Sequence, residues 1–273
     1  MTAPVAEVVP DQALGLLVGR DLVVLTGAGL STDSGIPDYR GPGSPKRAPM
    51  NIAEFRSGPA AQQRYWARSH LGWSRMGGAE PNAGHLALAR LDPTLLITQN
   101  VDGLHERAGS RRMVALHGRI AEVVCLDCRE VSPRSRLQDR LARANPGYAA
   151  RHAAAPSRPD GDVDLDDTAD FVVPGCESCG GLLKPDVVFF GENVPPARVE
   201  RCYAAVDALT PDGGALLVAG SSLTVMSGFR FVRRAAALRV PVVIANRGAT
   251  RGDDHATYTL DVGCSEFLTA LAG

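Results

Sequence analysis

The segment Asp21-Leu-Val-Val-Leu-Thr26-Gly27-Ala28-Gly29-Leu30-Ser31 decides the fold of this chain, because a short apolar run leads directly into a glycine-rich turn. A β-branched run of this kind is typical of a strand buried on both faces of a parallel sheet. Glycines directly after such a strand let the backbone approach a pyrophosphate, whose charge meets the N–H groups of the following helix. The segment therefore predicts the first strand and turn of a nucleotide-binding α/β domain.

Similar apolar runs recur along the chain at Thr94–Thr98, Met113–Leu116, Asp186–Phe190, Ala215–Ala219 and Pro241–Ala245. Helical patterns lie between them at Asn82–Leu91, Pro196–Ala208 and Gly228–Leu238, and Asn82 is a candidate N-cap. Strands separated by helices of this length indicate βαβ units. We therefore predict an α/β fold with a doubly wound parallel sheet.

Two features separate this chain from the dehydrogenases. The glycine turn lacks the third glycine of the dehydrogenase fingerprint, and the second strand ends in Thr98-Gln99-Asn100 instead of the acidic residue that holds the adenosine ribose. The pattern is compatible with a bound dinucleotide but does not indicate hydride transfer.

Four of the six cysteines form two Cys-x-x-Cys pairs, Cys125 with Cys128 and Cys176 with Cys179. Two such pairs can offer four thiolates to a tetrahedral Zn²⁺, which leaves no open position for a reacting water. The ion would therefore be structural. The alternative is a set of buried or disulfide-bonded cysteines; zinc is favoured because neither remaining cysteine, Cys202 or Cys264, has a nearby partner in sequence.

The composition limits the classes of partner. The chain has 273 residues, is 45% hydrophobic and carries a formal net charge of −1. This length allows one large domain with a smaller module, and the charge gives no bulk attraction to nucleic acid or an anionic membrane. No apolar run approaches the ~18 residues of a membrane span, and the amino terminus lacks a basic signal-peptide region. Because paired cysteines of this spacing suit a reducing compartment, we expect a cytoplasmic protein.

Polar segments follow the glycine turn and two of the expected strands. Ser34–Arg40 places an acid, an aromatic ring and a guanidinium on a loop that glycine and proline constrain. Thr98–His105 and Leu116–Gly118 come directly after strands, where ligands of open α/β sheets bind. A single histidine is more often structural than catalytic. At a strand end, beside a glycine, His117 leaves the two interpretations evenly balanced.

In their order along the chain, these segments resemble the motifs of the sirtuins, a family of NAD-dependent protein deacylases. The resemblance covers nearly the whole chain and rests on Gly27–Ser31, Gly35–Arg40, Thr98–Asp102, Leu116–Gly118, the four paired cysteines, Lys184–Glu192, Gly220–Ser222 and Ala245–Asn246. Within the family the chain most resembles class II, which includes the mitochondrial lipoamidase/ADP-ribosyltransferase-type sirtuin of animals. The residues behind this finer resemblance are Gln63–Arg68, Gly109–Arg112 and Thr250–Asp254.

The resemblance implies a large and a smaller domain with the active site in a cleft between them. Residues 1–40, 81–118 and 185–273 would form the Rossmann-like NAD-binding domain. The smaller domain would combine a helical lobe at 41–80 with a zinc-binding module at 119–184.

The resemblance also implies the chemistry. The amide oxygen of an acylated lysine attacks C1′ of the nicotinamide ribose and expels nicotinamide; His117 then takes a proton through the ribose hydroxyls, and O-acyl-ADP-ribose is released. Asn100 and Asp102 would join His117 as catalytic residues that line the nicotinamide pocket. The implied cofactor-binding residues are Gly27, Ala28, Gly29, Ser31, Asp38, Tyr39, Arg40, Gln99, Asn100, Val101, Asp102, Gly220, Ser221, Ser222, Asn246, Arg247, Gly248 and Cys264.

The implied partner is an acylated-lysine protein, bound as an extended peptide between Val187–Gly191 and the segment near Ser227 and Gly228. Arg47 and Arg56 are candidates for contacting an acidic acyl group, with a surface role as the alternative. Two other functions stay open: a protein mono-ADP-ribosyltransferase and a non-catalytic NAD-sensing module. A free NAD hydrolase fits less well, because the chain resembles the family over its peptide-binding segments too. The sequence does not indicate the oligomeric state.

Overall fold

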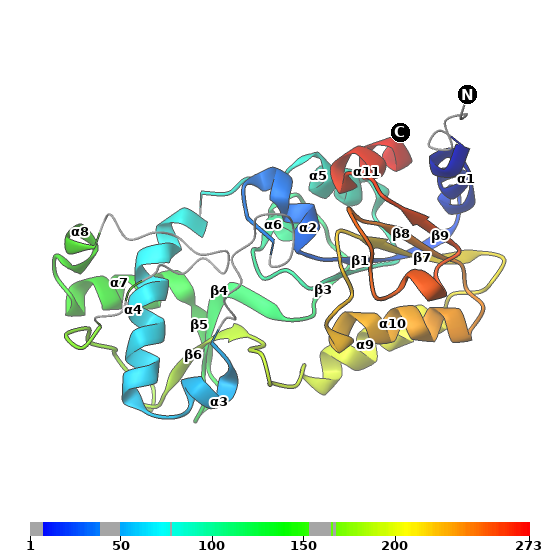
Figure 1. Cartoon of the computed structure of the whole chain (residues 1–273). Helices are drawn as coiled ribbons and strands as arrows, with labels where there is room; N and C mark the ends of the chain where they lie inside the picture. Colours follow the sequence, from blue (N-terminus) through cyan, green and yellow to red (C-terminus); the bar gives the residue numbers. More distant parts are fainter. Residues whose placement is uncertain (1–7, 39–49, 77, 153–164, 166–167) are drawn as a thin grey trace.

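A six-stranded parallel sheet covered by helices on both faces and a smaller three-stranded antiparallel sheet make up the computed structural model of the chain (Figure 1). The structure describes residues 8–38, 50–76, 78–152, 165 and 168–273. Among these residues, no helix combines the length and the hydropathy that crossing a bilayer requires.

The large sheet has the strand order β3-β2-β1-β7-β8-β9, and every neighbouring pair is parallel. Its strands are β1 (Asp21–Thr26), β2 (Leu95–Thr98), β3 (Met113–Ala115), β7 (Gly214–Ala219), β8 (Val242–Ala245) and β9 (Tyr258–Leu260). The order reverses between β1 and β7, which is the switch point where open α/β sheets bind ligands. The predicted doubly wound sheet is confirmed.

Alternate residues of β1 point into two separate cores. Leu22 and Val24 belong to one, covered by α1 (Val8–Leu17), α5 (Ala83–Leu91) and α11 (Cys264–Ala272). Val23 and Leu25 belong to the other, covered by α9 (Pro196–Asp207) and α10 (Met226–Ala237). Because both faces are buried, the strand needs an apolar residue at every interior position, which is the pattern in the sequence.

The N-cap of α5 is Asn82, as predicted. Its side chain accepts hydrogen bonds from the backbone N–H groups of Gly84 and His85. The Asn82 amide also donates to the carbonyl of Leu30 at 2.7 Å and to the hydroxyl of Ser34 at 3.1 Å. One side chain thus starts α5 and fastens the segment after the glycine turn to it.

The strand predicted at Asp186–Phe190 is wrong in position and in partner. The observed strand β6 (Leu183–Val187) lies at the edge of the smaller sheet, antiparallel to β4 (Gly118–Cys125), which also pairs with β5 (Val131–Pro133). Pro185 has no N–H to donate, which suits an edge strand. The proposed domain boundary between residues 184 and 185 falls inside β6, and the large sheet takes its sixth strand from β9.

The smaller sheet shares one core with the helices beside it, α3 (Ile52–Phe55), α4 (Pro59–Met76), α7 (Arg134–Ala144) and α8 (Tyr148–Arg151). Trp66 of α4 is fully buried, and its indole N–H donates to the carbonyl of Leu183 at 3.0 Å. The smaller module therefore packs as one unit (Figure 1). The loops carry the remaining short elements, α2 (Ala28–Ser31), η1 (Thr32–Ser34), α6 (Leu104–Arg107) and η2 (Asp253–His255).

Candidate active site

The glycines after β1 and β7 allow two loops to cross at close range. A Cβ at Gly27 would lie 2.7 Å from the carbonyl oxygen of Gly220, and the N–H of Gly29 donates to that same oxygen at 2.9 Å. Gly220 itself has a φ of +67°, and a Cβ there would come within 2.4 Å of the Leu30 nitrogen. The sequence predicted a glycine turn for a pyrophosphate, but not this contact at the switch point.

Three predicted site residues meet beside this crossing. The Ser31 hydroxyl donates to Asp102 Oδ2 at 2.7 Å and accepts from the Asn100 amide at 3.0 Å. The Asn100 amide also donates to the carbonyl of Gly27 at 3.0 Å, and Asp102 Oδ1 accepts from the N–H of Leu104 at the start of α6. The loop after β2 is thereby fixed to the glycine turn, with a carboxylate and an amide at its surface.

His117 follows β3 and is held at both ring nitrogens. Its Nδ1 lies 2.9 Å from the backbone carbonyl oxygen of Gln99, and its Nε2 lies 2.8 Å from the hydroxyl of Ser227. A carbonyl can only accept, so Nδ1 carries the hydrogen and the Nε2 lone pair faces Ser227. Burial lowers the pKa of His117 below its usual value, although the bond to Gln99 acts in the opposite direction. The ring is therefore neutral at pH 7, with Nε2 as its proton acceptor.

The glycine next to His117 is required by the neighbouring strand. Gly118 has a φ of +85°, and a Cβ on it would lie 1.8 Å from the carbonyl oxygen of Asp186 in β6. The N–H of Val188 donates to the carbonyl of His117 at 2.8 Å, and Arg198 pairs with Asp186 at 2.8 Å. The smaller sheet thus begins directly at the histidine.

The predicted residues after β7 and β8 lie at the same edge of the sheet. Ser221 donates to Gln99 Oε1 at 2.6 Å, and the hydroxyls of Ser222 and Thr224 lie 3.0 Å apart. The Asn246 amide donates to the carbonyls of Arg247 and Gly248 at 2.9 Å each.

Cys264 is the first residue of α11. It is buried, its thiol lies 3.6 Å from the carbonyl of Ala245, and burial raises its pKa to about 11. A buried thiol with a raised pKa contributes to packing and is not a reactive nucleophile.

The four paired cysteines form a structural zinc site. Their sulfur atoms all lie within 4.8 Å of one another, with Cys125 and Cys179 3.6 Å apart and Cys128 and Cys176 3.8 Å apart. A tetrahedron with Zn–S bonds of about 2.3 Å has sulfur–sulfur edges of about 3.8 Å, so the donor set fits the ion. None of the six cysteines forms a disulfide, which excludes the disulfide alternative.

Some predicted site residues do not belong to the cluster at the carboxyl ends of the strands. Tyr39, Arg40 and Arg47 lie outside the described residues, and Asp38 is the last described residue before that gap. Val101 makes a backbone contact, in which its carbonyl accepts a hydrogen bond from the N–H of Ile120 at 2.9 Å. Arg56 is an exposed residue just after α3.

Sequence reasoning did not find two contacts of the site. One is Ser227 on His117, which no motif indicated. The other is the buried Lys184, whose ammonium lies 3.1 Å from Glu192 Oε2 and 4.6 Å from the centre of the Phe189 ring. Burial lowers the pKa of Lys184, and Glu192 opposes that effect. The available signal in the sequence was that Lys184 and Glu192 lie eight residues apart in one segment that resembles a sirtuin motif.

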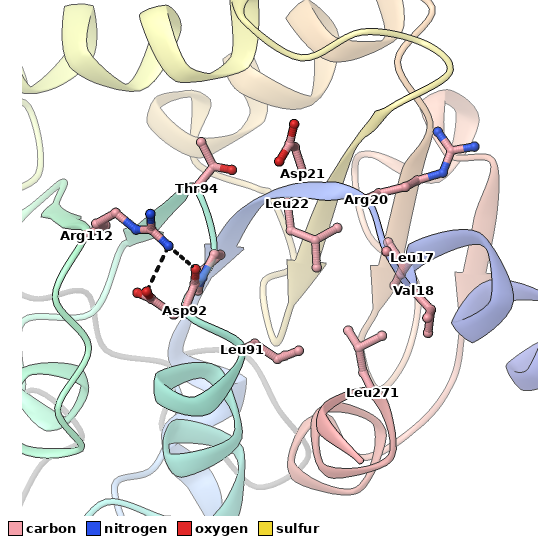
Figure 2. A pocket seen from close by; sticks show the side chains of 12 residues that line it. Leu17, Val18, Arg20, Asp21, Leu22, Leu91, Asp92, Thr94, Arg112 and Leu271 are labelled. Atoms are coloured by element: carbon pink, nitrogen blue, oxygen red, sulfur yellow. Dashed lines mark hydrogen bonds and ion pairs between the residues drawn. The ribbon is translucent and has the colours of Figure 1, made fainter.

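A cavity of about 330 Å³ opens at the opposite edge of the sheet, where β1 and β2 begin (Figure 2). It lies between Leu17, Leu22, Leu91 and Leu271, and the ion pair of Arg112 and Asp92 at 2.9 Å stands at its side. Of the predicted site residues that the structure describes, none lines this cavity. The cluster at the carboxyl ends of the strands remains the candidate active site.

Comparisons with known proteins identify the family of the chain. The NAD-dependent protein deacetylase 1 of Mycobacterium avium is 52% identical over 268 residues, which are 96% of this chain and 94% of that protein. The NAD-dependent protein deacetylase of Xanthomonas axonopodis pv. citri is 52% identical over 92% of this chain and 86% of its own length. A solved structure of Sir2 with a p53 peptide and NAD⁺ is 31% identical, covers 95% of both chains and has a TM-score of 0.73. The model of the Sir2 family matches residues 27–227, so the chain belongs to the Sir2 family.

Proposed function

We propose that the chain is an NAD-dependent protein-lysine deacylase that releases nicotinamide and O-acyl-ADP-ribose. The relatives at 52% identity are named NAD-dependent protein deacetylases, which supports the activity. One observation carries the proposal. The neutral His117 offers a fixed proton acceptor on the edge of the sheet that also holds Asn100 and Asp102.

In this proposal His117 is the general base. Its Nε2 takes a proton that leaves through a ribose hydroxyl of NAD, so an oxygen of that ribose can attack the carbon of the transferred acyl group. A positioned general base contributes roughly 10²–10⁴-fold to a rate. Because Nδ1 is held by the Gln99 carbonyl, the ring keeps the tautomer that this role needs.

Asn100 and Asp102 would serve the nicotinamide end of NAD. An ionised carboxylate only accepts hydrogen bonds, and Asp102 would accept the carboxamide N–H of nicotinamide. The Asn100 amide is already committed to Gly27 and Ser31, which supports a role in holding the pocket's shape. NAD is a co-substrate here, and it supplies the ribose carbon to which the acyl oxygen is transferred.

We assign the rest of NAD to the loops at the switch point. The glycine turn at Gly27–Ser31 would face the pyrophosphate, and Gly220–Ser222 with Asn246–Gly248 would face the adenosine half. This arrangement is supported by the position of all three segments at the carboxyl edge of neighbouring strands.

The acylated lysine would arrive in an extended peptide beside Val187–Gly191. The N–H of Val188 donates to the backbone carbonyl of His117, which joins this segment to the base residue, and Phe190 is 44% exposed. A solved Sir2 structure with a TM-score of 0.72 and 29% identity was obtained with a propionylated peptide, so that relative binds a propionyl-bearing peptide. This supports deacylation in the broader sense as the activity to test.

The finer assignment to class II, near the lipoamidase/ADP-ribosyltransferase-type sirtuins, belongs to the same proposal. Two of the residues behind it join α4 to the segment between α8 and β6. The Gln63 amide donates to the Phe171 carbonyl at 2.6 Å, and Arg68 donates to the Leu165 carbonyl at 2.8 Å.

The test is mass spectrometry of one peptide carrying acetyl, propionyl, succinyl or lipoyl groups on its lysine, incubated with the protein and NAD⁺. We expect peptide-dependent release of nicotinamide and O-acyl-ADP-ribose, and loss of O-acyl-ADP-ribose formation in His117→Ala while NAD still binds. Labelled ADP-ribose retained on protein would instead indicate a mono-ADP-ribosyltransferase. NAD binding without any product would indicate an NAD-sensing module, and NAD consumption without peptide would indicate an NAD hydrolase.

A further inference from the structure

We infer that Ser227 is a positioning residue for the general base. Its hydroxyl holds the His117 ring in the orientation in which Nε2 can take a proton from the ribose hydroxyl. This inference rests on the proposed function and adds a residue to it. Ser227 Oγ lies 2.8 Å from Nε2 although 110 residues separate the two in sequence.

The two ring contacts of His117 act together. The Gln99 carbonyl holds Nδ1 at 2.9 Å, and a single contact would leave the imidazole free to swing about it. The Ser227 hydroxyl holds the other nitrogen and fixes the plane of the ring. The ring is then presented in one orientation before any substrate arrives.

Ser227 is itself firmly placed. It lies in the first turn of α10, directly after Met226, and its side chain is 8% exposed. The next residue, Gly228, lies so close to the Gln99 carboxamide that a Cβ would come within 2.8 Å of the amide nitrogen. Ser221 holds the other side of that carboxamide at 2.6 Å. The start of α10 therefore acts on the base in two ways: Ser227 contacts the His117 ring, and Gly228 packs against the side chain of Gln99, whose backbone carbonyl holds Nδ1.

A hydroxyl suits this place because it can donate and accept. It donates to Nε2 while the imidazole is neutral. Because Nε2 has a single lone pair, the ribose hydroxyl replaces the Ser227 O–H on it when NAD binds. As the ribose O–H bond breaks and a new N–H bond forms at Nε2, the Ser227 hydroxyl turns and accepts that N–H. The contact with Ser227 therefore holds the ring before NAD binds and again after the proton has moved.

The experiment separates two half-reactions. Exchange of labelled nicotinamide into NAD⁺, dependent on acetyl-peptide, needs bond breakage at C1′ but no base, whereas formation of O-acetyl-ADP-ribose needs the base. In Ser227→Ala, we expect product formation to fall about tenfold, as loss of one hydrogen bond predicts, while exchange stays within about twofold of wild type. Ser227→Thr keeps the hydroxyl and should retain the wild-type ratio of the two rates.

A matched control is Ser69→Ala, which removes another buried serine hydroxyl from a helix, α4 of the smaller module, and should leave both rates unchanged. Parallel loss of exchange and product formation in Ser227→Ala, or no change in their ratio, would overturn the positioning role. A Thr variant that behaves like the Ala variant would do the same. Absence of both reactions in the wild-type protein would instead overturn the proposed function itself.

Discussion

The hydroxyl of Ser31 donates to the carboxylate of Asp102 at 2.7 Å, which joins the turn after β1 to the loop after β2. Ser31 is only 1% exposed, so this bond is shielded from water on one side. The other carboxylate oxygen accepts the N–H of Leu104 at the start of α6. Asp102 therefore holds two loops in place, besides its proposed contact with nicotinamide.

Asp102→Asn should weaken the handling of nicotinamide more than the binding of NAD. The variant keeps the size but replaces an acceptor-only group by an amide, and hydrogen bonds to a charged group are the stronger kind. We expect the inhibition constant of nicotinamide to rise about tenfold. Asp92→Asn, on the opposite edge of the sheet, is the matched control. An unchanged inhibition constant in Asp102→Asn would remove the carboxylate from the pocket.

The pH dependence of the reaction should follow the buried histidine. Burial lowers the pKa of His117, so the neutral, active form persists to a lower pH than for an exposed imidazole. The acid limb of kcat/KM for an acetylated peptide should therefore fall below the usual value of about 6.5. We would measure the profile at constant ionic strength. An acid limb displaced above that value would contradict a neutral, desolvated base.

Zinc should be structural and depend on the paired cysteines alone. Cys128→Ser removes one of four ligands, and we expect loss of the metal and of folded protein, because metal binding is coupled to folding at such sites. Cys202→Ser is the control, since Cys202 is fully buried on α9 and burial raises its pKa to about 12. The measurement is metal content per chain, with about one zinc expected in wild type. Full zinc content in Cys128→Ser would refute the site.

The pair of Lys184 and Glu192 should stabilise the segment beside the base. Glu192→Gln would leave a buried ammonium without its carboxylate, and we expect a loss of about 1–3 kcal/mol in the free energy of unfolding. Chemical denaturation of Lys184→Met, Glu192→Gln and the double variant measures the coupling between them. A coupling near zero would mean that the buried lysine is held by the carbonyls of Pro185 and Val187 alone.

The sequence predicted the large sheet better than the smaller one. The β1 segment with its glycine turn and the N-cap Asn82 are local signals, and both are confirmed. The strand expected at Asp186–Phe190 failed because an apolar run does not reveal its partner, and β6 pairs with β4 instead of the large sheet. The strand β9, Tyr258-Thr259-Leu260, was missed because it is short and carries no apolar run.

The same limit applies to the site. Residues that follow parallel strands were expected to meet, and Ser31, Asn100 and Asp102 do. The contact of His117 with Ser227 depends on where α10 begins in space, which no local pattern encodes. The crossing of Gly27 and Gly29 over Gly220 was hidden for the same reason, since glycine patterns do not distinguish a ligand from a neighbouring loop.

The proposed NAD-dependent deacylation is tested by the stoichiometry of the wild-type reaction with NAD⁺ and an acetyl-lysine peptide. We predict about one nicotinamide and one O-acetyl-ADP-ribose for each acetyl group removed, and no reaction when NADH replaces NAD⁺, because an uncharged dihydronicotinamide is a poor leaving group. Appearance of NADH absorbance during turnover, or equal activity with NADH, would contradict the account and indicate an oxidoreductase.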